Sequence, residues 1–230
     1  MSKILALDTA SDACSVALNI DGEIHEEFAL VPREHTQRLL PMVDRILTKA
    51  QLKVEDLDAI AFTRGPGSFT GVRICISVVQ GLAFGANVPV IPLSTLQVMA
   101  AGARRLLTEA KEGRLLVALD ARMSEVYWCA FDENDQMGQE HVISPEHLLE
   151  NELLWSGVQP AMALGPGWHY ETLNAIPRQE TQLEFYPHAY DLAALAATAF
   201  ARGEWVKAEE AEPVYLRDTV SWKKREKKRK

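Results

Sequence analysis

Three glycines ahead of a predicted helix form the part of this sequence best suited to hold an anion. Residues 63–73 read TRGPGSFTGVR, and Gly65, Gly67 and Gly71 lead into an apolar stretch over residues 72–85. Free N–H groups and the helix dipole at such a helix start can bind a phosphate. No Gly-Lys-Ser/Thr follows, so the segment is not a Walker A loop, and it lacks the dinucleotide fingerprint. The alternative is a tight strand-to-helix connection whose glycines serve only the backbone shape.

Two aspartates stand where apolar strands are expected to end. Asp8 follows residues 3–7 and Asp120 follows residues 114–119, each before a tight turn and another strand. Asp in such a hairpin can hold a metal or water beside a phosphate if a small neighbour lets the backbone approach. The second hairpin instead carries the large Arg122. We therefore expect Asp8 to be a turn residue and the phosphate loops at Asp8, Gly65, Gly67 and Asp120 to be degenerate. Arg122 could then face an acidic partner group or an RNA phosphate.

The order of these parts occurs twice along the chain. An Asp-bearing hairpin precedes a strand and a Gly-Pro-Gly loop both at Gly65 and at Gly165, which indicates two related lobes. Such lobes are typical of the actin-like ATPase (ASKHA) superfamily, an α/β fold of two ribonuclease-H-like lobes with mixed sheets flanked by helices. We predict an N-terminal, partner-binding lobe over 1–108, a smaller C-terminal lobe over 109–221, and a disordered basic tail over 222–230.

Hydrophobic periodicity predicts the elements that position these residues. Alternating or continuous apolar runs predict strands over 3–7, 14–20, 23–30, 58–62, 89–92, 114–119, 125–131 and 161–164. Helical spacing predicts helices over 33–50, 72–85, 95–107 and 188–202, and another beginning at Pro145. Asp21-Gly22 marks a hairpin turn, and Ser94 to Gln97 forms a capping box.

Composition points to a globular protein of a reducing compartment. The 230 residues are 47% hydrophobic and 24% charged, which excludes disorder as the main state. The three cysteines lie far apart and are odd in number, so neither a disulfide scaffold nor a zinc knuckle is expected. No apolar run approaches the ~20 residues of a membrane span, and Asp8 interrupts the first apolar run too soon for a signal peptide. We expect a cytoplasmic protein without a membrane partner.

The net charge of −8 is unevenly distributed. Residues 222–230 hold seven Lys or Arg and one Glu, a local charge of +6, so the other 221 residues carry −14. An acidic body argues against broad nucleic-acid binding by the globular part, because phosphate contacts need a positive face. The tail alone could contact RNA, or it could serve only as a solubilising end.

Five blocks in the chain resemble the TsaB/YeaZ family, and they span nearly its whole length: residues 4–10, 32–38, 64–73, 120–127 and 212–217. The resemblance implies a non-catalytic subunit required for threonylcarbamoylation of the tRNA adenosine beside the anticodon (t6A). It implies that this subunit binds and organises the metal-bearing transferase TsaD together with the ATPase TsaE. The tRNA would be reached through that complex, and a homodimer is a second expected assembly.

The same resemblance locates where a metal would be bound. The transferase relative holds its metal with a His-x-x-x-His pair at the start of a helix, and the matching positions here are Thr95 and Met99. Neither is a good ligand for a hard or borderline cation. We therefore expect no metal site, no cofactor and no catalytic residue. The alternatives are a self-sufficient ATPase or kinase, which needs intact hairpins, and a metallopeptidase-like enzyme, which needs the missing ligands.

The predicted helix over 33–50 is the expected partner interface. Its apolar residues spread over about 160° of a helical wheel, wider than one-sided packing requires. One edge could cover the sheet and the other a partner helix, in the transferase or in a second copy. The alternative is that a wide stripe covers a broad sheet. The predicted interface residues are His35, Arg38, Leu39, Met42, Val43 and Ile46.

Overall fold

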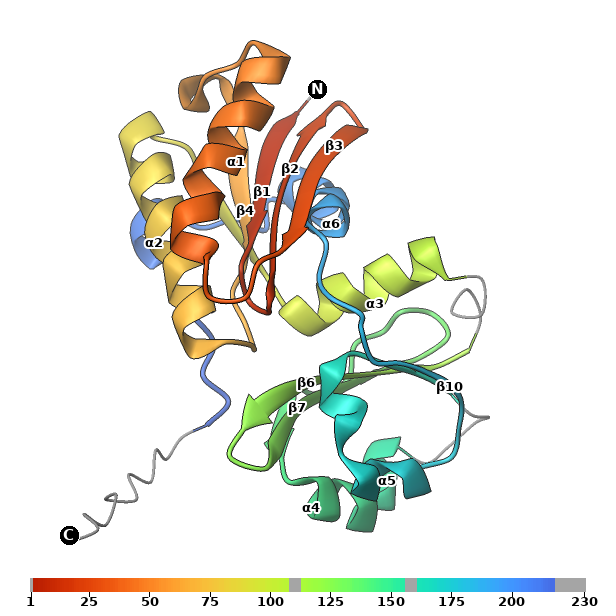
Figure 1. Cartoon of the computed structure of the whole chain (residues 1–230). Coiled ribbons are helices and arrows are strands. Elements are labelled where there is room, and N and C mark those ends of the chain that lie inside the picture. Colours follow the sequence, from red (N-terminus) through yellow and green to blue (C-terminus); the bar gives the residue numbers. More distant parts are fainter. Residues whose placement is uncertain (1, 108–112, 156–160, 218–230) are drawn as a thin grey trace, which may run out of the picture.

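The structure is a computed structural model that describes residues 2–107, 113–155 and 161–217 (Figure 1). It contains two five-stranded sheets, each flanked by helices, which confirms the predicted two-lobed α/β fold. The basic tail over 222–230 lies outside the described residues. The division at residue 108 stays a prediction.

The first sheet has the strand order β3-β2-β1-β4-β5. Strands β1, β2 and β3 form an antiparallel meander, and β4 and β5 run parallel to β1. The central strands are almost fully buried, because helices cover both faces of this sheet. The strands span β1 Lys3–Asp8, β2 Ala13–Ile20, β3 Glu23–Leu30, β4 Ala59–Thr63 and β5 Val90–Leu93.

Helices α1 (His35–Ala50) and α2 (Phe69–Ala86) cover one face of the first sheet, and α6 (Ala189–Ala201) covers the other (Figure 1). Helix α6 follows the second sheet in the chain, yet it buries its alanines against small residues of β1, β2 and β4, because a helix this apolar needs a sheet face to cover it. The chain therefore returns to the first lobe near its end.

Helix α2 begins three residues before the predicted start, because Ser68 caps it by accepting a hydrogen bond from the Gly71 N–H at 3.2 Å. In the described residues, α2 is the one helix long and apolar enough, by length and composition, to cross a membrane. The sequence predicted no run of this length. One side of α2 is buried in the first core, and its other side is largely exposed.

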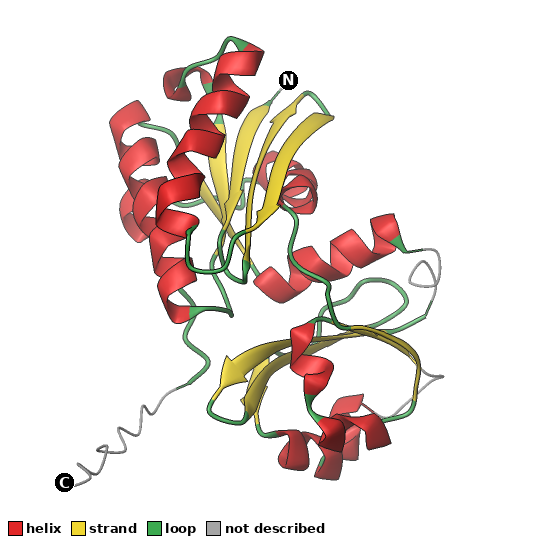
Figure 2. Cartoon of the chain, viewed as in Figure 1, coloured by secondary structure: helices red, strands yellow, loops and turns green. Residues whose placement is uncertain are grey.

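The second sheet has the order β10-β9-β6-β7-β8 and repeats the plan of the first, with an antiparallel hairpin beside parallel strands (Figure 2). Its strands are β6 Leu115–Arg122, β7 Glu125–Phe131, β8 His141–Ile143, β9 Ala161–Leu164 and β10 Arg178–Gln182. Short helices accompany both lobes: α4 Pro145–Glu150, α5 Glu152–Trp155, and 3₁₀ turns Val54–Asp56, Pro166–His169, Glu171–Ala175 and Ala208–Glu210.

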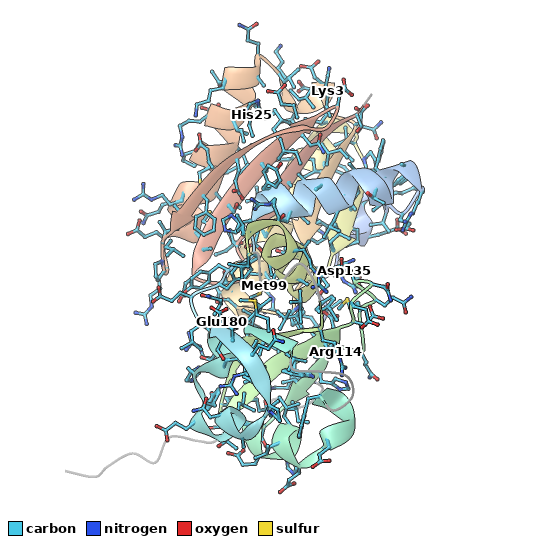
Figure 3. All side chains as sticks on the ribbon, turned by 90° about the vertical axis from the view of Figure 1, so that its right-hand side faces the viewer. Lys3, His25, Met99, Arg114, Asp135 and Glu180 are labelled. Carbon is cyan, nitrogen blue, oxygen red and sulfur yellow. The ribbon has the colours of Figure 1, made fainter. Side chains whose placement is uncertain are left out.

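Helix α3 (Thr95–Leu106) joins the two lobes. One side of α3 packs on the second sheet, and Val98 on another side packs against α6. Met99 lies near the middle of the molecule, between the two sheets (Figure 3). The order of layers is thus α1 and α2, first sheet, α6, α3, second sheet and the short helices. A shared central layer of this kind limits how freely one lobe can move against the other.

Candidate functional site

The two lobes enclose a cleft of about 730 Å³ at the ends of their first hairpins. The first lobe contributes the β1–β2 turn and the start of α2. The second lobe contributes the end of β6, its turn and residues near the Pro166 3₁₀ turn. A third wall comes from residues 213–217 near the end of the described chain. The cleft lies where the predicted phosphate loops would face one another, so their geometry can be compared with the sequence prediction.

The first glycine loop packs against the chain's own backbone. A Cβ at Gly67 would overlap the carbonyl oxygen of Ala10, and a Cβ at Gly71 would overlap that of Thr9. Ser68 N–H donates to the Ala10 carbonyl at 2.7 Å, and the Thr9 hydroxyl donates to the Gly71 carbonyl at 2.7 Å. The space that these glycines keep open is filled by the β1–β2 turn. These two glycines allow close packing of the backbone, which was the second of the two roles expected for them.

The second lobe has the same close packing of glycines against its own backbone. Cβ atoms at Gly165 and Gly167 would both collide with the backbone of Ala118 in β6. Trp168, just beyond, donates from its indole nitrogen to the Leu116 carbonyl at 3.0 Å and fixes the loop on the strand. Both glycine loops therefore pack against the backbone of their own lobe, the first on the turn after β1 and the second on β6.

Asp8 is fully buried and does not line the cleft. Its Oδ1 accepts a hydrogen bond from the Thr63 hydroxyl at 2.6 Å and another from Ala10 N–H at 3.3 Å. Oδ2 has no hydrogen-bond partner among the described residues. Burial raises the pKa of Asp8 to about 7, although the Thr63 hydrogen bond opposes the rise. The bond to Ala10 is that of a turn-forming aspartate.

Asp120 is placed differently from Asp8, because it lines the cleft. Its carboxylate accepts from the Arg122 guanidinium at 2.8 Å and from the Arg122 N–H at 2.9 Å, and the Tyr170 hydroxyl donates to it at 3.3 Å. The Arg122 side chain is 81% exposed. A large cation thus lies beside the second aspartate. The position two residues after the aspartate is the small Ala10 in the first hairpin but Arg122 in the second, where the large side chain hinders a close phosphate approach.

A group of residues that the sequence pattern did not predict to meet lies at the mouth of the cleft. The Arg73 guanidinium lies over the Phe69 ring, 3.3 Å from its centroid, and faces the Tyr215 ring at 5.1 Å. It donates to the Tyr215 hydroxyl and to the Phe69 carbonyl. Val214 N–H donates to the Arg64 carbonyl at 2.9 Å, which holds the C-terminal segment on the first lobe. Arg217 then pairs with Glu125 of the second lobe.

The sequence holds a signal for this group, because residues 64–73 and 212–217 both belong to the blocks that resemble the TsaB/YeaZ family. Nothing in their spacing indicated that they meet.

The metal-ligand positions of the transferase relative do not fit a metal here. Thr95 and Met99 are both fully buried on α3, and the Met99 side chain packs at Gly165. The Thr95 hydroxyl has no partner among the described residues, yet a hydroxyl and a thioether are poor ligands for a borderline cation. In the described ranges, three or more His, Cys, Asp or Glu side chains nowhere gather at a metal-binding distance.

The predicted interface residues mostly face inward. Leu39, Met42, Val43 and Ile46 are each under 5% exposed in the first core, and buried His35 lies 3.2 Å from the Ala13 carbonyl. They do not form a free surface, because the buried side of α1 packs against β2 and α2. The wide stripe covers the sheet and a neighbouring helix. On the outer side, Leu40 is 49% exposed.

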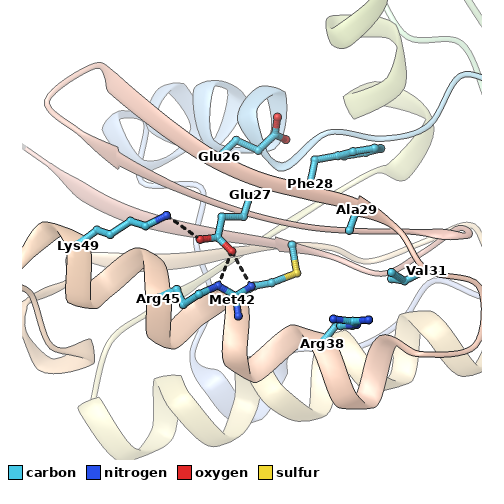
Figure 4. Close-up of a pocket in the computed structure, with 9 residues that line it drawn as sticks. All are labelled: Glu26, Glu27, Phe28, Ala29, Val31, Arg38, Met42, Arg45 and Lys49. Carbon is cyan, nitrogen blue, oxygen red and sulfur yellow. Dashed lines mark hydrogen bonds and ion pairs between the residues drawn. The ribbon is translucent and has the colours of Figure 1, made fainter.

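Arg38 is also exposed and lines a shallow groove between α1 and the edge strand β3 (Figure 4). In that groove Arg45 and Lys49 both donate to Glu27, at 2.7 and 3.1 Å. The charged side chains of the groove are thus largely paired with one another. The exposed part of α1 that remains for a partner is its outward side, which carries Leu40.

Comparisons with known proteins cover the whole of this architecture. The family model described as "TsaD: tRNA N6-adenosine threonylcarbamoyltransferase" matches residues 23–215. The "tRNA threonylcarbamoyladenosine biosynthesis protein TsaB" of Escherichia coli K12 is 46% identical to this chain, and the match covers 96% of the chain and 97% of that protein. The Haemophilus influenzae protein of the same name is 39% identical, with 96% of each chain covered. The solved structure "YeaZ from Pseudomonas aeruginosa" superposes with a TM-score of 0.83 at 43% identity, covering 94% of this chain and 100% of that one.

Proposed function

Because the chain belongs to the TsaB/YeaZ family of tRNA threonylcarbamoyladenosine biosynthesis proteins, we propose that it is a non-catalytic subunit of that pathway. In this proposal it binds and organises the metal-bearing transferase TsaD together with the ATPase TsaE, and it meets tRNA through the complex. A homodimer of the free chain is a second proposed assembly. The cytoplasmic location inferred from composition stays a prediction.

The closed glycine loops are the observation that carries the non-catalytic assignment. An ATPase or kinase of this fold needs backbone N–H groups open to a phosphate. Here Gly67 and Gly71 are occupied by the turn at Thr9 and Ala10, and the Ser68 N–H is already bonded to Ala10. The buried Asp8 faces Thr63 and not the cleft. The residues for phosphate chemistry are therefore present in the sequence but committed to internal contacts.

The alternative enzymatic functions make a simple kinetic prediction. A self-sufficient ATPase would turn over ATP at ~1 per second or faster, within the usual range of enzymes. A metallopeptidase would cleave peptides at a comparable rate, but Thr95 and Met99 offer it no ligand set. We expect neither activity from the purified chain. Turnover that persists through further purification would overturn the non-catalytic assignment.

The outward sides of α1 and α2 support the proposed partner surface. Only 33% of the α2 residues are buried, although the helix is strongly apolar, and Phe84 near its end is 70% exposed. Leu40 on the neighbouring α1 is 49% exposed. An apolar helix that its own lobe covers on one side only is typical of a protein interface. We therefore move the proposed interface from the inward residues of α1 to this outward α1/α2 surface.

A charge placed on this surface tests the assignment. We expect Leu40→Arg and Phe84→Arg to fold normally and to bind the purified transferase subunit at least about ten-fold more weakly, because each buries a charge at the interface. Leu183→Arg is the matched control, since Leu183 is 44% exposed in the second lobe. Affinity is measured by calorimetry and assembly by size exclusion. Wild-type affinity in both α1/α2 variants would place the interface elsewhere, and absence of any complex with the wild-type chain would refute the proposed function.

A further inference from the structure

From the mouth of the cleft we infer a binding site for single-stranded RNA in this chain itself. The inference rests on the proposed function in one respect, because a role in tRNA modification makes RNA the relevant anionic chain. The physical argument comes from the Arg73 cluster, defined here as Phe69, Arg73 and Tyr215, and from the charges around it.

Arg73 carries a positive charge that no acidic side chain among the described residues neutralises. Its hydrogen bonds go to the Phe69 carbonyl and the Tyr215 hydroxyl, and its flat faces meet aromatic rings. The guanidinium is therefore held in one orientation at the cleft mouth before any ligand arrives. A fixed planar cation of this kind suits a phosphate, which it can bind through two N–H groups.

The two rings of the cluster are unusually open to solvent. Phe69 is 66% exposed and Tyr215 is 54% exposed, and Met123 beside the cleft is 60% exposed. Tyr127 and Tyr186 line the cleft further in. Aromatic rings beside arginines are the combination on which unpaired bases stack, because every base offers a π face. A duplex does not expose its base faces in this way, so the ligand is single-stranded.

The lining of the cleft is less acidic than the body of the protein, because it holds three arginines, Arg73, Arg122 and Arg217, beside two aspartates, Asp12 and Asp120. Arg122 and Arg217 line the cleft with Arg73, although both are paired, with Asp120 and Glu125 respectively. The C-terminal segment of the described chain reaches the rim of the cleft at Arg217.

The cleft also has a suitable size. Its volume of about 730 Å³ lies in the range of sites that enclose a small ligand, which allows one or two nucleotides to enter while the rest of the strand continues along the rim. The closed glycine loops leave no phosphate cradle inside. The strand is therefore held at the mouth, by Arg73 and the two rings.

Fluorescence anisotropy with the full-length chain tests this site. The probes are a fluorescein-labelled RNA stem-loop with an unpaired loop and a fully paired RNA duplex of the same length. We expect the stem-loop to bind more tightly than the duplex, and Phe69→Ala or Tyr215→Ala to weaken stem-loop binding by about 5- to 100-fold, the effect of losing a stacked base. Arg73→Ala should weaken it comparably. Trp205→Ala and Arg202→Ala are matched controls, because both residues are exposed and lie outside the cleft.

Four results would overturn the inference. They are no binding of the stem-loop, equal affinity for stem-loop and duplex, stem-loop affinity that survives all three cluster variants, and loss of all binding when residues 222–230 alone are deleted, which would assign the RNA contact to the tail. The same variants are assembled with the transferase subunit by size exclusion. Normal assembly with unchanged RNA affinity refutes this inference only, whereas failure of the wild-type chain to assemble refutes the proposed function.

Discussion

Removing the charge of Asp8 should abolish a loss of stability that develops as the pH rises. Asp8 is fully buried, one of its oxygens has no partner among the described residues, and burial raises its pKa from an ordinary 3.8 to about 7. Because the folded pKa exceeds the unfolded one, the native state binds the proton more tightly. The resulting penalty is absent below the unfolded pKa, grows as the pH rises from about 4 to 7, and is complete above the folded pKa. Asp8→Asn cannot ionise and escapes this penalty.

The size of the effect follows from the two pKa values. At about 1.4 kcal/mol for each pH unit between them, the full penalty is on the order of 4 kcal/mol. Between about pH 5 and pH 8, the part that develops is roughly 3 kcal/mol. Asn keeps an oxygen to accept from Thr63 but introduces a buried amide N–H₂, so it has a cost of its own. That cost does not depend on pH, and the change with pH therefore isolates the ionisation.

Urea unfolding at about pH 5 and pH 8 gives the free energy of unfolding of the wild type and of Asp8→Asn. We expect the free energy of unfolding of the variant, relative to that of the wild type, to rise by roughly 3 kcal/mol between the two pH values. Asp44→Asn, which removes an exposed carboxylate from α1, is the control. A difference between wild type and Asp8→Asn that stays constant within about 0.5 kcal/mol over this range would show that Asp8 ionises as freely in the folded protein as in the unfolded chain.

Three further predictions concern packing and reactivity. Gly71→Ala should destabilise the protein by about 1–3 kcal/mol, because the added Cβ overlaps the Thr9 carbonyl. Gly81→Ala, in open space on the same helix, should stabilise it by up to about 1 kcal/mol, and thermal unfolding of the two variants tests both expectations. In urea unfolding, Leu39→Ala should lower the free energy of unfolding by about 2–5 kcal/mol, and Leu40→Ala should lower it by less than about 1 kcal/mol. Equal losses in the two variants would contradict the inward placement of Leu39. The three cysteines are buried and burial raises the pKa of each thiol, so a thiol reagent should label them only after unfolding; rapid labelling of the native protein would contradict this.

Elements with strong local signals could be predicted almost to the residue. Strand β3 and strand β7 span the predicted residues 23–30 and 125–131, because alternation and a turn delimit them on both sides. The Ser94 cap fixed the start of α3. Strands β8 and β10 were missed, since β8 is only three residues long and β10, RQETQ, lies at a sheet edge where polar residues face solvent.

The site was less predictable, because it depends on contacts between residues far apart in the chain. Arg73 and Tyr215 are 142 positions apart, and no local pattern announces their pairing. The glycine loops were recognised, but their sequence alone could not tell a phosphate cradle from a close backbone contact. Likewise, the helical wheel gave the width of the α1 stripe without showing that the sheet and α2 together cover it.

The position of α6 has a consequence for how the protein folds as it is synthesised. The first sheet is complete once residue 93 has emerged from the ribosome, yet the helix that covers its second face is not made until about residue 200. During that interval the apolar face of Ile4, Ala17 and Ala61 is left without its final cover. A nascent chain in this state resembles a folding intermediate with an exposed sheet face, which is prone to aggregate or to recruit a chaperone. The first sheet is therefore an early-formed but incomplete structure until α6 covers its second face.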